Sequence, residues 1–195
     1  IVFFSDNGGA PQLGASNAPL KAGKRDVYEG GHRVPMMMHW PAQVKAGQRF
    51  EHPITNLDFY PTFASLAGAT IPDGKKLDGK DIWADVMAGR DPHAGEMTFT
   101  MSHRHGFTDA SGRLGKWKAV KAYQRPWMLY NLEKDIGETH NAGPANPELL
   151  KDLVGKIKAW ADTHQKPLWM YDPKDAEDFK SNSKPYFDDT FELEP

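Results

Sequence analysis

Asp6 and Asn7 end an apolar run and stand directly before Gly8-Gly9, and their types suit metal chemistry. A carboxylate and a carboxamide supply hard oxygen ligands, which suit Ca²⁺ or Mg²⁺ better than zinc. The alternative is structural, because Asp-Asn-Gly-Gly is also ideal sequence for a tight turn. Two oxygens are too few for a cation that binds about six or more, so other ligands must come from elsewhere.

Lys24 is a second candidate, this time for binding an anion. It follows Gly23 in a stretch rich in glycine, where an ammonium group can approach an anion closely. The alternative is a solvated surface lysine, which is the commoner role of an arbitrary lysine. A phosphate-binding P-loop is excluded, because its first glycine is absent and Arg25 follows the lysine.

The composition limits the classes of protein to consider. The chain has 195 residues, of which 39% are hydrophobic and 26% charged, which fits a soluble globular protein and excludes general disorder. The net charge of −2 gives no general attraction to nucleic acid, and no apolar run is long enough to span a membrane. The absence of cysteine excludes disulfides, thiolate metal sites and a cysteine nucleophile within these residues.

The start of the chain indicates a piece of something larger. It opens without methionine on the apolar run 1–4, so we expect it to begin inside a longer protein. The lack of a signal peptide is then uninformative. The compartment stays open, with the bacterial periplasm or exterior as the expectation.

Residues 1–92 are predicted to form the C-terminal part of an α/β domain that positions the candidate residues. Two apolar runs without polar alternation predict strands covered on both faces in a mostly parallel sheet. A long loop rich in Gly, Pro and Asn joins them, and two short helices that end at glycine follow. These elements are the strands 1–4 and 34–40, the loop 8–31, the helix 58–67 with Asp58 as N-cap, and the helix 78–89.

Residues 93–171 are predicted to form a small α+β subdomain. Short apolar runs separated by Gly, Asp and Pro predict an antiparallel sheet. One long amphipathic helix follows, with an apolar stripe on one face and lysines on the other. The strands are 97–102, 117–122 and 127–132, the helix is 147–164, and an acidic surface tail is expected at 172–195.

The motifs of the chain, taken in order, resemble those of the sulfatase family of the alkaline phosphatase superfamily. Members show Ser-Asp-Asn-Gly-Gly, Asn-x-Pro-Leu-Arg-x-Gly-Lys, Tyr-Glu-Gly-Gly-x-Arg-Val-Pro, Trp-Pro and Asp-Leu-Tyr-Pro-Thr. The corresponding residues are Ser5-Asp6-Asn7-Gly8-Gly9, Asn17-Ala18-Pro19-Leu20-Lys21-Ala22-Gly23-Lys24, Tyr28-Glu29-Gly30-Gly31-His32-Arg33-Val34-Pro35, Trp40-Pro41 and Asp58-Phe59-Tyr60-Pro61-Thr62. Downstream, Gly115-Lys116-Trp117-Lys118 and Asp135-Ile136-Gly137-Glu138 resemble the family's C-terminal subdomain.

The resemblance implies the C-terminal part of an alkaline-phosphatase-like sandwich, followed by the small subdomain. Asp6 and Asn7 would ligate a divalent metal, usually calcium with Mg²⁺ as the alternative, and Lys24 would be a catalytic contact to the sulfate ester. The family's nucleophile is a formylglycine made from Cys or Ser in an upstream Cys/Ser-x-Pro/Ala-x-Arg motif, which has no match here. This chain alone is therefore expected to be inactive. Its expected partners are the missing N-terminal half and a sulfated small molecule or saccharide.

Several residues of the loop depart from the family pattern. Lys21 stands where Arg is usual, Ala22 where Gly is frequent, Arg25-Asp26 where small residues are typical, and His32 where an aliphatic residue is common. These departures leave the metal pair intact but can alter how the loop meets a substrate. Arg33 is expected to pair with carboxylates or loop carbonyls, and Glu29 to serve as a cap or in a salt bridge.

His103, Arg104 and His105 follow a predicted strand and are candidate substrate contacts, because Arg and His suit a sulfated or carboxylated sugar. The alternative is a solvated hairpin loop, which is favoured because loops often carry such charge. His39 lies within an apolar run and is interpreted as a satisfied core residue.

Three functions remain open on the sequence. The first is a sulfatase that acts on a sulfated carbohydrate or an aryl sulfate. The second is a phosphodiesterase or phosphonate monoester hydrolase of the same superfamily, which shares the Asp-Asn pair. The third is a binding or structural fragment without catalysis. An upstream formylglycine motif supports the first function, and the absence of any nucleophile supports the third.

Overall fold

The computed structural model describes residues 1–104, 107–122, 125–164, 173–174 and 177. The chain divides into two units: Ile1–Phe3 with Met37–Glu96, and Phe4–Met36 with Met97–Pro195. Residues of Phe4–Met36 pack on the sheet of the second unit. The predicted tail 172–195 lies outside the described residues, except for 173–174 and 177.

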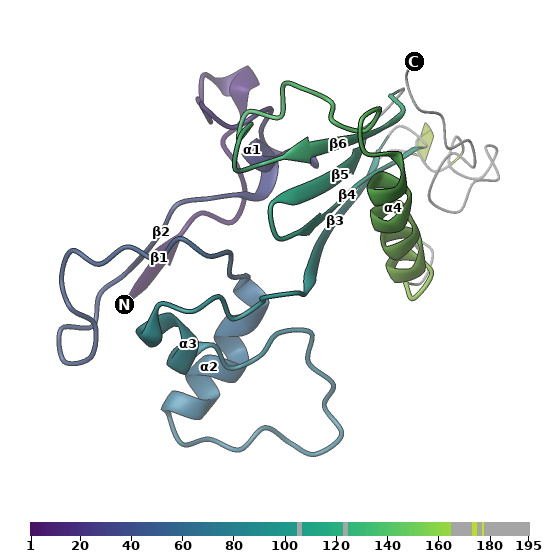
Figure 1. Ribbon diagram of the computed structural model, residues 1–195. Helices are drawn as coiled ribbons and strands as arrows, with labels where there is room; N and C mark the ends of the chain where they lie inside the picture. Colours follow the sequence, from purple (N-terminus) through teal and green to yellow (C-terminus); the bar gives the residue numbers. More distant parts are fainter. Residues whose placement is uncertain (105–106, 123–124, 165–172, 175–176, 178–195) are drawn as a thin grey trace. The chain divides into compact units, whose positions relative to one another are not determined.

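The first unit contains two short helices, α2 Phe59–Leu66 and α3 Trp83–Ala88 (Figure 1). Both helices are predicted by the sequence, and each is followed by a left-handed glycine, Gly68 at φ 66° and Gly89 at φ 69°. Asp58 takes the N-cap position of α2, as predicted, but its side chain makes no capping hydrogen bond to that helix. A 3₁₀ turn, η2 Asn56–Asp58, precedes α2, and its capping box pairs Thr55 reciprocally with Asp58.

The two apolar strands form at the predicted places, as β1 Val2–Phe4 and β2 Met36–Met38, and pair with each other. Ile1 and His39 exchange both backbone hydrogen bonds, at 2.9 and 2.8 Å, which is the pattern of an antiparallel pair. In the described part of the chain this pair is therefore antiparallel, although a mostly parallel sheet is predicted, and it lacks the predicted cover on both faces: Phe3 is 64% exposed and Met37 62%. His39 is also exposed, so its interpretation as a core residue is wrong.

The second unit contains a four-stranded antiparallel sheet in sequential order: β3 Met97–Arg104, β4 Phe107–Leu114, β5 Trp117–Lys121 and β6 Trp127–Asn131. The sequence predicts three of these strands, and β4 is absent from the prediction. Its residues alternate between polar and small side chains, and Asp109 and Ser111 are buried, which hides the usual apolar signal of a strand. Gly115, at φ 57°, lies in the tight turn from β4 to β5.

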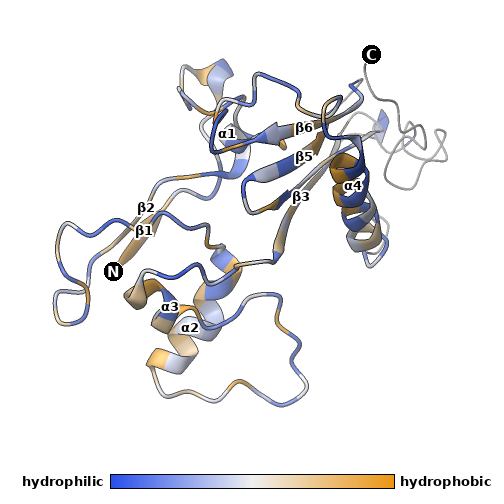
Figure 2. Cartoon of the chain, viewed as in Figure 1, coloured by the Kyte–Doolittle hydropathy of each residue, from blue (hydrophilic) through white to orange (hydrophobic). Residues whose placement is uncertain are grey.

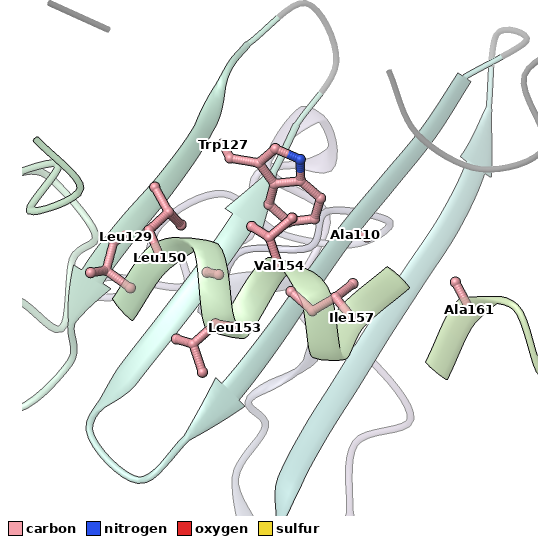
Figure 3. Close-up of a cluster of buried hydrophobic side chains, with 9 residues drawn as sticks. Ala110, Trp127, Leu129, Leu150, Leu153, Val154, Ile157 and Ala161 are labelled. Carbon is pink, nitrogen blue, oxygen red and sulfur yellow. The ribbon is translucent and has the colours of Figure 1, made fainter. Parts of the chain in front are cut away.

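Helix α4 Pro147–Ala161 covers one face of this sheet and confirms the predicted long helix. Its apolar stripe carries the spacing of an amphipathic helix, and a polar stripe lies beside it (Figure 2). Figure 3 shows the core between helix and sheet. The buried residues of this core are Ala110, Ala119, Trp127, Leu129, Leu150, Leu153, Val154, Ile157 and Ala161. A side chain at Gly112 would lie 2.7 Å from Ile157, so that glycine lets helix and sheet approach closely.

The opposite face of the sheet supports the segment that carries the candidate site. Along a strand, side chains alternate between faces, so Val120 points away from Ala119 and Tyr130 away from Leu129. Val120, Met128, Tyr130 and Leu132 form a second core with Val27. The loop therefore lies on the sheet, and it contains two short helical turns, η1 Pro11–Leu13 and α1 Glu29–His32. Among the described residues, no helix combines the length and the apolarity that crossing a bilayer requires.

Candidate functional site

The Asp6-Asn7 turn and the loop of Lys24 lie side by side, although Lys24 comes 17 positions after Asn7 in the sequence. The backbone N–H of Lys24 donates to the carbonyl of Gly9 at 3.0 Å. The carboxamide of Asn17 completes the connection. Its Oδ1 accepts from the N–H of Gly9 at 2.8 Å, and its Nδ2 donates to the carbonyls of Gly9 at 2.9 Å and Ala22 at 3.0 Å. Asn17 thus links the segment after the Asp6-Asn7 turn to the loop of Lys24. The sequence motif alone did not predict this role for Asn17.

Glycines allow the backbone segments around the site to pack directly on one another. The N–H of Gly8 donates to the carbonyl of Gly31 at 2.9 Å. A Cβ at Gly8 would lie 1.7 Å from the carbonyl oxygen of Gly30, and one at Gly31 would lie 2.0 Å from that of Asp26. No side chain fits at either position, so the two Gly-Gly pairs are required for close approach.

The loop of Lys24 has a strained backbone. Ala22 has φ 62° and Arg25 has φ 79°, both in the left-handed region that non-glycine residues rarely adopt. Glycine is frequent in the family at the position of Ala22. Ala22 thus adopts a backbone conformation that glycine adopts more easily than alanine does. Asp26 supports the turn, because its Oδ2 accepts from the N–H of Gly23 at 3.2 Å. Such strain persists only where the surroundings fix the conformation, and it often marks a functional site.

Asp6 and Asn7 have the donor chemistry of part of a hard-cation site. The carboxylate of Asp6 is exposed, and the carboxamide of Asn7 contacts it, so their oxygens lie on one turn. The hydroxyl of Ser5 donates to the carbonyl of Asn7 at 2.8 Å and holds that turn. Within the described ranges, no group of three or more His, Cys, Asp or Glu side chains could hold a metal by itself. The pair therefore fits a Ca²⁺ or Mg²⁺ site only as part of a larger ligand set.

A buried ion triad lies behind the loop, where Lys118 of β5 meets Glu29 of α1 and Glu138. The Nζ of Lys118 lies 2.9 Å from Glu29 Oε1 and 2.9 Å from Glu138 Oε1, and all three side chains are 2% exposed or less. The N–H of Glu29 donates to Glu138 Oε2 at 2.7 Å. Glu29 is thus in a salt bridge, one of the two roles predicted for it. Lys118 and Glu138 lie in matched motifs, but sequence reasoning assigned them no role.

The Lys118 ammonium stabilises the negative charge of Glu29 more than that of Glu138. Burial acts to raise the pKa of Glu29, but the adjacent Lys118 ammonium outweighs it and the pKa is lowered. Burial raises the pKa of Glu138, which Lys118 only partly offsets. Burial and the Lys118 ammonium, 3.2 Å from its Nε2, lower the pKa of His32 to about 4, so that ring is neutral at neutral pH.

Two arginines and Lys21 complete the surroundings of the triad. Arg33 lies 3.5 Å and Arg113 3.8 Å from Glu29 Oε2. Arg33 thereby pairs with a carboxylate, as predicted. Lys21 donates to the carbonyl of Glu138 at 2.9 Å, and its ammonium lies 4.2 Å from the ring centroid of Tyr28. Lys21 therefore anchors the loop to the C-terminal residues.

The candidate substrate contacts His103, Arg104 and His105 remain predictions. His103 and Arg104 are the last residues of β3 and pair with Thr108 and Phe107 of β4. Only their backbone is described, and His105 lies outside the described residues.

The first unit holds a second polar cluster, centred on His93, which sequence reasoning missed. His93 Nε2 lies 2.9 Å from Oδ2 of the buried Asp58, and its Nδ1 lies 2.8 Å from Glu96 Oε2. Glu96 also contacts Lys80, whose backbone N–H donates to Asp58 Oδ1 at 3.2 Å. Hydrogen bonds from both ring nitrogens to carboxylates require a protonated ring. Burial acts to lower the pKa of His93, but Glu96 and Asp58 outweigh it and the pKa is raised.

This cluster predicts a pH-dependent contribution to stability. Because the folded pKa of His93 is raised, its contribution is fully present below the unfolded value of about 6.5 and is lost as pH rises through the folded pKa. We expect His93→Gln to lower the melting temperature of the protein more at pH 6 than at pH 9. Calorimetric scans of both proteins at the two pH values check this, and an equal difference at both would contradict it.

Comparisons with known proteins identify the family of the chain. Residues 22–163 match the family described as N-sulphoglucosamine sulphohydrolase, C-terminal. The chain is 31% identical over 192 residues to a sulfatase of Formosa agariphila, which covers 88% of this chain and 34% of the relative. It is 45% identical over 207 residues to the steryl-sulfatase of Homo sapiens, which covers 86% of this chain and 35% of the relative. The chain thus spans about a third of the length of these relatives.

Solved structures agree in fold. The crystal structure of Ps i-CgsB in complex with k-i-k-neocarrahexaose superposes with a TM-score of 0.92 and 44% identity, over 99% of this chain and 43% of that chain. The phosphonate monoester hydrolase of Agrobacterium radiobacter, at a TM-score of 0.59 and 21% identity, shows the shared fold alone. The chain therefore belongs to the sulfatase family, within the alkaline phosphatase superfamily, and corresponds to its C-terminal portion.

Proposed function

We propose that the protein carrying this chain hydrolyses sulfate esters, and that the chain supplies part of the metal site and the lysine that contacts the ester. The observation that carries this proposal is the clamp of Asn17. In a member of the sulfatase family, it ties the Asp6-Asn7 turn to the strained loop of Lys24, with Gly9 as the common partner. Three groups suited to one anionic ester therefore come from two loops that are held together.

Asp6 and Asn7 would hold a divalent cation, Ca²⁺ or alternatively Mg²⁺, with further ligands from other residues of the protein. When bound, the cation polarises the sulfuryl oxygens. Lys24 has an exposed side chain on a loop with a fixed backbone, so its ammonium can reach an ester without moving the loop. There it stabilises the negative charge that builds on the bridging oxygen as the alcohol departs, or donates a proton to that oxygen.

The covalent nucleophile of this proposal is a formylglycine from outside these residues. The chain has no cysteine and no Ser-x-Pro/Ala-x-Arg sequence from which a formylglycine could form. The chain by itself is thus expected to bind but not to turn over a sulfate ester.

A sulfated saccharide is the substrate class that we favour. The support is the similarity, at 44% identity and a TM-score of 0.92, to a protein crystallised with k-i-k-neocarrahexaose. A steryl or aryl sulfate is the second candidate, because the human steryl-sulfatase is 45% identical over the aligned residues. A phosphonate monoesterase has weaker support, because its solved relative shares only the fold.

Measurement of inorganic sulfate released by the complete protein tests this function. We expect release from a sulfated neocarrageenan oligosaccharide in the presence of Ca²⁺, and none from the desulfated oligosaccharide. An aryl sulfate and a phosphonate monoester serve as competing substrates. Turnover of the phosphonate with no sulfate release from either sulfate ester would overturn the proposal.

A further inference from the structure

We infer that Lys118, held between Glu29 and Glu138, is a positioning residue for Lys24 and for the Asp6-Asn7 pair. It touches none of these groups. The inference rests on the proposed function of these groups, and it assigns to the C-terminal sheet the task of fixing the loops that meet the ester.

The triad is unusually buried for three charged side chains: Lys118 is 1% exposed, Glu29 2% and Glu138 0%. Replacing a buried ion pair by apolar side chains is often neutral for stability, so packing alone does not require the triad. Removal of one partner has a different effect, because it leaves an uncompensated buried charge that forces its neighbours to move. The triad therefore fixes one geometry strongly.

Glu138 is the fixed point of the triad. Its backbone has φ 51°, a left-handed conformation that is strained for a glutamate. Three groups hold it there: Lys118 at Oε1, the N–H of Glu29 at Oε2, and the Nζ of Lys21 at its carbonyl. Glu29 and Lys21 both belong to the candidate loop, so the strained residue is fastened to the loop at two places.

The loop transmits this attachment to the candidate groups through backbone contacts. Glu29 is the first residue of α1, and the next residue, Gly30, donates to the carbonyl of Lys21 at 2.9 Å. Gly31 accepts from Gly8, which follows Asn7 directly. These backbone segments are in direct contact, because a Cβ at Gly30 would lie 2.3 Å from the Lys21 oxygen. A shift of α1 would therefore displace the Asp6-Asn7 turn and the start of the Lys24 loop together.

Lys118 is well placed to resist such a shift. It lies in β5, a central strand that pairs with β4 on one side and β6 on the other. Its side chain shares a face with Val120, which packs against Val27 of the loop. The sheet is in turn held by the core beneath α4. The ammonium of Lys118 thus joins a central strand of the sheet to the loop that carries the candidate groups.

The test uses the complete protein, with Lys118→Met and with Glu29→Gln, which removes one charge at constant shape. For each variant, kcat and KM on a sulfate ester are measured per folded molecule, together with hydrogen exchange of the peptides that cover residues 5–24. We expect Lys118→Met to lower kcat about tenfold to a hundredfold, the range set by a misplacement near 1 Å. Exchange at the amides of Gly8 and Lys24 should rise. Lys118→Arg, which keeps the charge, should retain more of kcat than Lys118→Met.

Combination with Lys24→Ala separates positioning from general structural support. Because Lys118 acts partly through Lys24, Lys118→Met should lower kcat by a smaller factor in a Lys24→Ala background than in the wild-type protein, and the loss that remains reports on the Asp6-Asn7 pair. The matched control is Lys156→Met, which removes an exposed lysine of α4 that pairs only at the surface with Asp152. It should leave kcat and exchange unchanged.

Three outcomes would overturn the inference: unchanged kcat per folded molecule, equal losses in both backgrounds, or unchanged exchange in residues 5–24. If Lys118→Met does not fold, Glu29→Gln is judged by the same criteria. Failure of the proposed function gives a different result from failure of this inference. In that case the wild-type protein releases no sulfate, while the exchange measurement still decides whether Lys118 holds the loops.

Discussion

Replacement of Lys24 by alanine is expected to lower kcat on a sulfate ester by at least about a hundredfold, the effect of one lost transition-state contact. The structure explains why the loss should fall on kcat and not on folding. The Lys24 side chain is exposed, and its loop is held by backbone bonds and by Asn17, which the substitution leaves in place. Steady-state kinetics on the complete protein provide the measurement.

The control for this prediction is Lys156→Ala, which removes an equally flexible lysine from the exposed face of α4. Its kcat should match that of the wild-type protein. A Lys24→Ala protein with wild-type turnover would remove Lys24 from the mechanism, whatever the family likeness indicates.

Replacement of Asp6 by alanine is expected to weaken Ca²⁺ binding by at least about a hundredfold, since loss of even an outer partner of a metal site costs tenfold or more. Asp6 carries the only formal charge of the Asp6-Asn7 pair, and its carboxylate is exposed, so its loss should leave the fold intact. Calorimetric titration of Ca²⁺ into the complete wild-type and variant proteins measures the difference.

The matched substitution for this titration is Asp152→Ala, which removes an exposed aspartate of α4 far along the chain. It should bind Ca²⁺ like the wild-type protein. Equal affinity in the wild-type and Asp6→Ala proteins would refute the ligand assignment of Asp6.

Elements with a strong local signal were predictable from the sequence. The apolar stripe of α4 and the glycines after α2 and α3 fix those helices within a few residues. Three strands of the C-terminal sheet follow from apolar runs between turn residues. Strand β4 was not predicted because polar and small side chains alternate along it, with Ala110 buried on one face and Asp109 and Ser111 buried on the other. Local patterning cannot reveal a strand that lacks an apolar alternation.

The candidate site was predictable in its residues but not in its supports. Asp6, Asn7 and Lys24 stand out by type and by motif. The triad does not, because Lys118 lies 89 residues from Glu29 in the sequence and follows an aromatic residue in a strand that reads as half exposed. Lysine is rarely buried, so the sequence predicts an exposed side chain at Lys118. The grouping of residues 4–36 with the C-terminal sheet rests on contacts of this kind, between residues that are far apart in the sequence.

The claim on which the account depends is that Asp6, Asn7 and Lys24 face one sulfate ester. A crystal structure of the complete protein with Ca²⁺ and a bound sulfated oligosaccharide tests it most directly. The account predicts a calcium ion within about 2.3–2.6 Å of an oxygen of Asp6 and of Asn7. It also predicts a sulfate oxygen within hydrogen-bonding distance of Lys24 Nζ. A calcium ion bound elsewhere, or a sulfate group that lies away from all three residues, would contradict it.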